Sequence, residues 1–207
     1  VGSEMCIRDS PWCGNGISAQ PGVYSSFDET DIRRKSLMVG QQYNMATGAP
    51  LSCQKDGTPL NYTEEIEPYE KAPQAAGARL NKYAWKTDDI WERDNDWVLM
   101  RYAEILLMRA EANFRLGFDG NALLLVNQLR GRAQVAPLAA VTEEDLDKEW
   151  LHEFVFEGLR RTVNIRFGTY FQPWWNKDAT PTYKGVFPIP QSVLDKNPNL
   201  KQNPDYL

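Results

Sequence analysis

The chain has 207 residues and a formal net charge of −5 at pH 7, so it is long enough for one domain with a sizeable core. The acidic balance disfavours DNA and RNA as partners, because nucleic-acid binding depends on clustered Lys and Arg side chains that displace counterions from phosphates. No run of about 18 apolar residues predicts a helix that would cross a membrane.

The first ten residues, VGSEMCIRDS, resemble the translation of a transposase adapter used in sequencing libraries. We therefore expect residues 1–10 to be a scar that does not belong to the natural protein. On this interpretation residues 11–207 are the carboxyl-terminal part of a longer reading frame. Its true amino terminus, with any signal peptide or lipidated cysteine, would then lie outside this chain.

Residues 11–96 are rich in Gly, Pro, Asn, Ser and Thr, which predicts a loop-rich region with a few short strands. The stretch DETDIRRKSLMVG can hold a short strand or a turn of helix. The stretch TGAPLSCQKDGTPL predicts a hairpin with Asp56 and Gly57 at its tip. A region of this length is too long for an ordinary loop, so we expect it to lie against a scaffold.

Residues 97–170 predict helices. The first is expected over residues 97–116, with Asp96 as its N-cap and Gly117 at its end. Its apolar face is predicted from three-to-four spacing and comprises Leu99, Ala103, Leu106, Ala110 and Phe114. A second helix is expected to begin at Asn121 and to bury Leu124, Val126, Leu129 and Ala133. Together they predict a helical hairpin whose A-x3-F element matches the tetratricopeptide unit.

A third helix is expected to begin at Thr142, a capping hydroxyl that is followed by three acids suited to the positive end of the helix dipole. We expect it to run to about Gly158 and to continue, through a bend at that glycine, into RRTVNIRFG. The tail over residues 171–207 is expected to be extended around its prolines, with at most one helical turn after Ser192.

Acidic and basic side chains recur along these helices, and we expect them to form structural ion pairs, since guanidinium groups match carboxylates in two-point hydrogen bonds. The residues in question are Arg101, Glu104, Glu111, Arg115, Arg130, Glu153, Glu157, Arg160 and Arg161. The alternative is a glycosidase, which would need one carboxyl group with a raised pKa. Neighbouring arginines lower carboxyl pKa values instead, so no catalytic residues are expected.

No metal or cofactor is expected. Cys13 and Cys53 lack the spacing of a zinc site or a disulfide framework. His152 is the only histidine, and no serine or cysteine motif surrounds it, so a packing role is preferred to a catalytic triad.

The stretch YFQPWWNKD places Trp174 and Trp175 next to each other after a proline. Flat indole faces suit the apolar faces of sugar rings, which makes both tryptophans candidates for ligand binding. The preferred alternative is that they pack as a plug at the end of the third helix. Trp12 and Asn15 in the stretch PWCGNG are likewise candidates either for ligand binding or for packing.

Several segments occur in an order that closely resembles the RagB/SusD family of nutrient-binding outer-membrane lipoproteins. They are DWVLMRYAEILLMRAEANFRLG, NQLRGRA, EWLHEFVFEGLRR, IRFG, FPIP and NPNLKQNPDY. The resemblance implies a mainly α fold of the α/α superhelical class, with tetratricopeptide-like helical hairpins, long irregular loops and a few short strands. Residues 11–207 would be the carboxyl-terminal part of such a domain.

The resemblance also implies a function. Members are lipid-anchored on the cell surface, bind a glycan or another nutrient and deliver it to a TonB-dependent outer-membrane transporter. The expected partners are therefore an oligosaccharide and that transporter, with membrane association only through a lipid anchor outside this chain, and with no enzyme activity. A different class stays open, because helical hairpins also build scaffolds that bind only protein.

Overall fold

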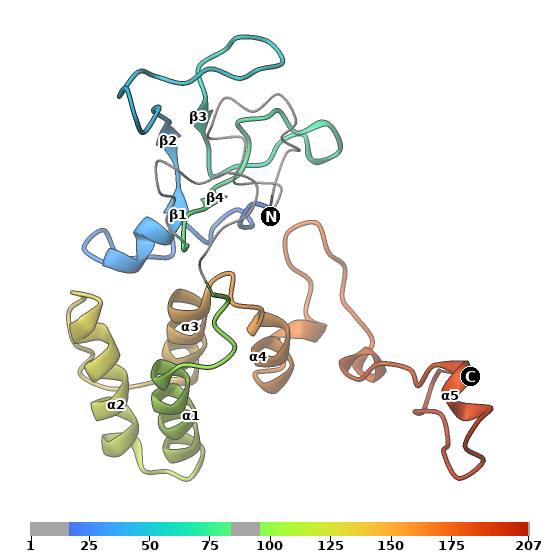
Figure 1. Cartoon of the computed structure of the whole chain (residues 1–207). Coiled ribbons are helices and arrows are strands. Elements are labelled where there is room, and N and C mark those ends of the chain that lie inside the picture. Colours follow the sequence, from blue (N-terminus) through green and yellow to red (C-terminus); the bar gives the residue numbers. More distant parts are fainter. Residues whose placement is uncertain (1–16, 84–95, 207) are drawn as a thin grey trace. The chain divides into compact units, whose positions relative to one another are not determined.

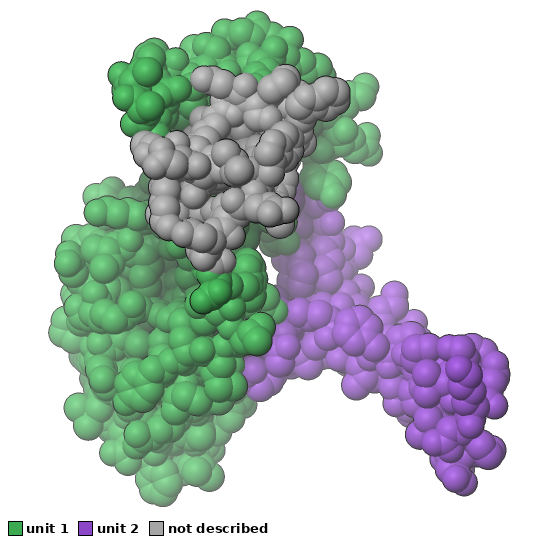
Figure 2. Space-filling model, in the orientation of Figure 1, with its two compact units in different colours: residues 1–158 green, residues 159–207 purple. Residues whose placement is uncertain are grey.

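A computed structural model describes residues 17–83 and 96–206. The chain divides into two compact units, residues 1–158 and residues 159–207, which are coloured separately in Figure 2. Each unit is described by itself. The proposed scar and the candidate residues Trp12 and Asn15 lie outside the described residues.

The first part of the first unit is mostly irregular, with short strands and 3-10 turns, as expected for a loop-rich region. Its elements are η2 (Ile32–Ser36), β1 (Leu37–Met38), β2 (Gly40–Gln41), β3 (Asn61–Tyr62), η3 (Tyr69–Lys71) and β4 (Arg79–Leu80). β1 pairs with β4 and β2 pairs with β3, both antiparallel. The predicted hairpin is confirmed: the N–H of Cys53 donates to the carbonyl of Thr58 at 2.6 Å, and Gly57 at the tip has φ 73°.

This irregular part shares a small core with the helical part. Phe27 and Leu37 are buried together with Val155, which directly follows the third helix. A second cluster comprises Cys53, Leu60 and Tyr62. The first cluster therefore joins β1 to the end of α3 through apolar contacts, in addition to the charged contacts described below.

Three helices complete the first unit, and Figure 1 shows the first two side by side as a hairpin. They are α1 (Tyr102–Arg115), α2 (Asp119–Arg132) and α3 (Glu143–Phe154). Ala110, Ala122 and Val126 are fully buried between them. The small alanines allow close approach of the helices, so the predicted helical hairpin is confirmed.

Two predicted helix starts are wrong. α1 begins at Tyr102 and not after Asp96, because the backbone of Arg101 is extended (φ −145°, ψ 161°). The Arg101 guanidinium pairs with Glu153 on α3. Leu99 consequently lies outside the helix and is 88% exposed. α2 begins at Asp119 and not at Asn121. The burial expected for Leu124 is also wrong, since it is 71% exposed. Two residues along a helix are about 200° apart, so Leu124 cannot share a face with Val126.

The start of α3 is confirmed but its end is wrong. Thr142 forms a capping box with Asp145, in which each side chain bonds to the other residue's backbone N–H. The helix ends at Phe154, short of Gly158, because Phe156 (φ 63°) and Gly158 (φ 82°) both have left-handed backbones that no α-helix accommodates.

The second unit contains short elements joined by extended chain. They are α4 (Arg160–Arg166), η4 (Thr169–Phe171), η5 (Thr182–Gly185) and α5 (Gln191–Leu194). The single helical turn expected in the tail is present and starts one residue before Ser192. Within the part of the chain that the structure describes, no helix combines the length and the apolar character that crossing a membrane requires.

Candidate functional site

A buried ion-pair network joins the irregular part of the first unit to α3. Arg33, which is only 8% exposed, lies at its centre. Its Nε and Nη2 donate to Asp31 at 2.9 and 2.8 Å, and its Nη1 donates to Glu149 at 2.9 Å and to Glu153 at 3.2 Å. One arginine in η2 thus satisfies carboxylates on two successive turns of α3.

The same network extends to the residues before α1 and at the end of α2. Arg101 donates to Glu153 at 2.5 Å and to Glu157 at 2.8 Å, and Lys82 also pairs with Glu157. From α2, Arg130 donates to Glu149 at 2.8 Å and Arg132 to Glu153 at 2.5 Å. Among the residues that the structure describes, the members of the network are Asp31, Arg33, Lys82, Arg101, Arg130, Arg132, Glu149, Glu153 and Glu157.

The electrostatics of Glu153 match a structural role. Burial favours the neutral acid, but the hydrogen bond from Arg101 and the charges of Arg132 and Arg33 outweigh burial and lower the pKa of this carboxyl group. A general acid of a glycosidase needs the opposite, a raised pKa. The Glu153 carboxylate is therefore suited to holding segments together and not to acting as a general acid.

The other residues expected in ion pairs have varied surroundings. Glu111 pairs with Arg115 at 3.1 Å and also accepts from the indole N–H of Trp150 at 3.0 Å. Glu104 is buried, and the described residues provide it with no ion pair. In the second unit, Arg161 donates to the carbonyl of Lys184 at 3.1 Å rather than to a carboxylate, while Arg160 lies in the first turn of α4.

His152 packs in the first unit. Its ring stacks on Phe27 with centroids 4.1 Å apart, and its Nε2 lies 3.0 Å from the hydroxyl oxygen of Ser26. Burial and the charge of Arg33 lower the pKa of His152 to about 4, so the ring is neutral at pH 7. Among the described residues, no group of three or more His, Cys, Asp or Glu side chains is arranged so that it could hold a metal ion.

The tryptophan loop, residues 170–178, lies in the second unit. Trp174 and Lys177 exchange backbone hydrogen bonds of 3.0 and 2.9 Å, which closes a tight turn with Trp175 and Asn176 at its tip. Asn176 has φ 52°, a left-handed backbone that Asn tolerates better than most residues. Both tryptophans are half-buried.

The Lys177 side chain stabilises this loop by bonding to its backbone carbonyls. Its Nζ donates to the carbonyls of Tyr170, Gln172 and Asp178 at 3.0, 3.1 and 3.0 Å. The ammonium also lies 4.2 Å from the ring centroid of Trp174. One face of the Trp174 indole is therefore covered by Lys177, which agrees with a packing role for Trp174. Trp175 lies at the tip of the turn.

The sequence is similar to those of proteins in one known family. The sequence model described as the SusD family matches residues 9–185. The chain is 40% identical over 123 residues to the starch-binding protein SusD of Bacteroides thetaiotaomicron, covering 55% of this chain and 22% of that protein. It is 30% identical over 152 residues to the SusD-like protein P38 of Formosa agariphila, covering 64% of this chain and 29% of that protein. The chain thus spans only about a quarter of the length of these curated relatives.

Solved structures are similar as well. The surface glycan-binding protein A from Bacteroides uniformis superposes with a TM-score of 0.59 at 25% identity, over 87% of this chain and 39% of that chain. A SusD superfamily protein from Parabacteroides distasonis superposes with a TM-score of 0.61 at 19% identity, over 100% of this chain and 45% of that chain. These similarities confirm the mainly helical, tetratricopeptide-like fold class.

Proposed function

Because this chain belongs to the SusD family, we propose that it is part of a cell-surface protein that binds a glycan and delivers it to a TonB-dependent outer-membrane transporter. The observation that carries this proposal is the 40% identity to a protein named as starch-binding. A structural relative is named as a surface glycan-binding protein, which supports the same class of ligand. Binding without covalent chemistry is consistent with the lowered pKa of Glu153.

The proposal includes where and how the protein works. Residues 11–207 would form the carboxyl-terminal part of a SusD-like domain that is anchored to the outer membrane by a lipid outside this chain. The candidate ligand-binding residues are Trp12, Asn15, Trp174 and Trp175. Affinity would come from stacking of sugar rings on indole faces and from hydrogen bonds to hydroxyl groups, so it should depend little on salt.

A glycan microarray probed at low and at high salt tests this function. We expect the protein to be retained on at least one oligosaccharide, with similar retention at both salt concentrations, because stacking and neutral hydrogen bonds are weakly screened. Retention on no carbohydrate, together with capture of a partner protein, would favour the helical scaffold instead.

Replacement of Trp175 by Ala should weaken binding to the retained oligosaccharide about tenfold, because one aromatic contact contributes about 0.5–1.5 kcal/mol beyond its buried area. The affinity is measured by isothermal titration calorimetry. Tyr69→Ala is the control, since Tyr69 is an aromatic residue outside the tryptophan loop, in η3, and is 57% exposed. If the Trp175 variant and the wild type bind with equal affinity, Trp175 does not contact the ligand.

A further inference from the structure

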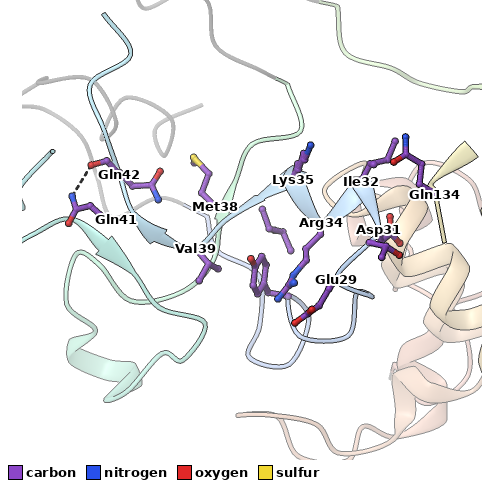
Figure 3. Close-up of a pocket in the computed structure, with 13 residues that line it drawn as sticks. Glu29, Asp31, Ile32, Arg34, Lys35, Met38, Val39, Gln41, Gln42 and Gln134 are labelled. Carbon is purple, nitrogen blue, oxygen red and sulfur yellow. Dashed lines mark hydrogen bonds between the residues drawn. The ribbon is translucent and has the colours of Figure 1, made fainter. Parts of the chain in front are cut away.

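A groove that shares no residue with the tryptophan loop lies beside η2, β1 and β2 in the first unit (Figure 3). It is also lined by the turn before η2 and by Gln134, two residues after α2. Its volume is about 610 Å³. Pockets for small ligands typically measure about 300–1,000 Å³, so the groove has the size of a binding site.

The two sides of the groove are bonded to each other. The backbone N–H of Ile32 in η2 donates to the carbonyl of Ala133 at 3.1 Å, directly before Gln134. Arg33, the next residue in η2, is held by Glu149 and Glu153 on α3. The groove is therefore formed without a ligand, which lowers the entropic cost of binding.

Two fixed acceptors lie at one end of the groove. The amide Nε2 of Gln41 donates to the carbonyls of Gln42 and Leu51 at 2.8 and 2.9 Å. The amide Nε2 of Gln42 donates to the carbonyl of Gly40 at 2.8 Å. These bonds fix both side-chain amides by their NH₂ groups and leave each Oε1 as a hydrogen-bond acceptor.

Charged side chains of both signs lie between this end and Gln134. Arg34 and Glu29 point to the same side of the chain, as Figure 3 shows, and the Arg34 guanidinium lies 4.2 Å from the ring centroid of Tyr24. Asp31 lines the groove, but its carboxylate forms an ion pair with Arg33. Lys35 lines the groove as well, so the wall offers two cations, one carboxylate outside the ion-pair network and several amides.

We propose that this groove is a second saccharide-binding site, for a neutral and hydroxyl-rich ligand. A saccharide carries several hydroxyl groups, and each donates one hydrogen bond and accepts two. Separate hydroxyl groups can therefore donate to Oε1 of Gln41, donate to Oε1 of Gln42 and accept from Arg34. An anionic ligand would meet Glu29 and the two amide oxygens, and a cationic ligand would meet Arg34 and Lys35. The proposal rests on the proposed function for its class of ligand.

The test is a double variant that removes two polar side chains lining the groove and leaves the backbone conformation unchanged. Gln134 has φ 61°, which glycine adopts readily, and Gln134 and Glu29 are both exposed, so Gln134→Gly with Glu29→Ala should fold normally. The probes are neutral oligosaccharides from starch and xylan and acidic oligosaccharides from pectin. We expect the neutral probe that the wild type binds to bind the variant about tenfold more weakly.

The matched control is Asp205→Gly with Glu70→Ala, because Asp205 has φ 64° and both residues are exposed and lie outside the groove. It should bind like the wild type. Equal affinities of the double variant and the wild type would overturn the groove proposal and leave the proposed function intact. Binding of the pectin probe alone would overturn the neutral class. If the wild type binds none of these probes or any arrayed glycan, the proposed function fails as well.

Discussion

Replacement of Glu153 by Gln should lower the free energy of unfolding by about 3–5 kcal/mol, the cost of removing one partner from a buried ion pair. The carboxylate accepts hydrogen bonds from Arg33, Arg101 and Arg132, and its side chain is only 1% exposed. A neutral amide cannot balance these charges, and its NH₂ group places two donors against other donors. The loss is measured by urea unfolding followed by circular dichroism at pH 7.

The control for this variant is Glu144→Gln. Glu144 pairs with Lys148 one turn along α3 at 2.8 Å, but the two side chains are 77% and 52% exposed. Exposed pairs contribute about 0.2–1 kcal/mol, so little stability should be lost. If both variants lose the same small amount, the buried network does not hold the irregular part onto the helices.

Acidification from pH 6.5 to pH 4 should destabilise the protein through His152 by up to about 3 kcal/mol. Its pKa is lowered from 6.5 to about 4 by burial and by the charge of Arg33, so the unfolded chain takes up the proton first. The stability is therefore fully present above pH 6.5 and is lost as the pH falls towards 4. Glu153, whose pKa is lowered from 4.5, acts in a lower pH range.

His152→Gln isolates this contribution. Glutamine can still bond to Ser26, which lies 3.0 Å from the His152 ring, but it does not titrate. Urea unfolding at several pH values between 4 and 6.5 should therefore give a flatter dependence of stability on pH for the variant than for the wild type. Parallel curves would show that other groups cause the acid sensitivity.

Local patterns in the sequence predicted local structure well. The Thr142 cap depends on residues three positions apart, and the face formed by Val126, Leu129 and Ala133 depends on helical spacing alone. Predictions near helix ends failed where a distant contact decides the backbone. Arg101 is extended because its guanidinium reaches Glu153, which lies 52 positions away.

The centre of the ion-pair network could not be predicted for the same reason. Asp31 and Arg33 stand in a segment with no clear periodicity, and Arg33 meets Glu149 and Glu153 across 116 and 120 positions. The repeat of glutamates along α3 was a signal that cations were needed, but it did not identify which segment supplies them. The role of Lys177 inside the tryptophan loop was not predicted either, because only the folded turn brings three carbonyls around its ammonium.

The most direct test of this account is a crystal structure of the protein with a bound oligosaccharide from the microarray. We predict an intact sugar chain against irregular segments, at the tryptophan loop or at the groove beside η2, with Arg33 still bonded to Glu149 and Glu153 on α3. A sugar lodged between those two carboxylates, with the arginines displaced and the glycosidic bond cleaved, would contradict it.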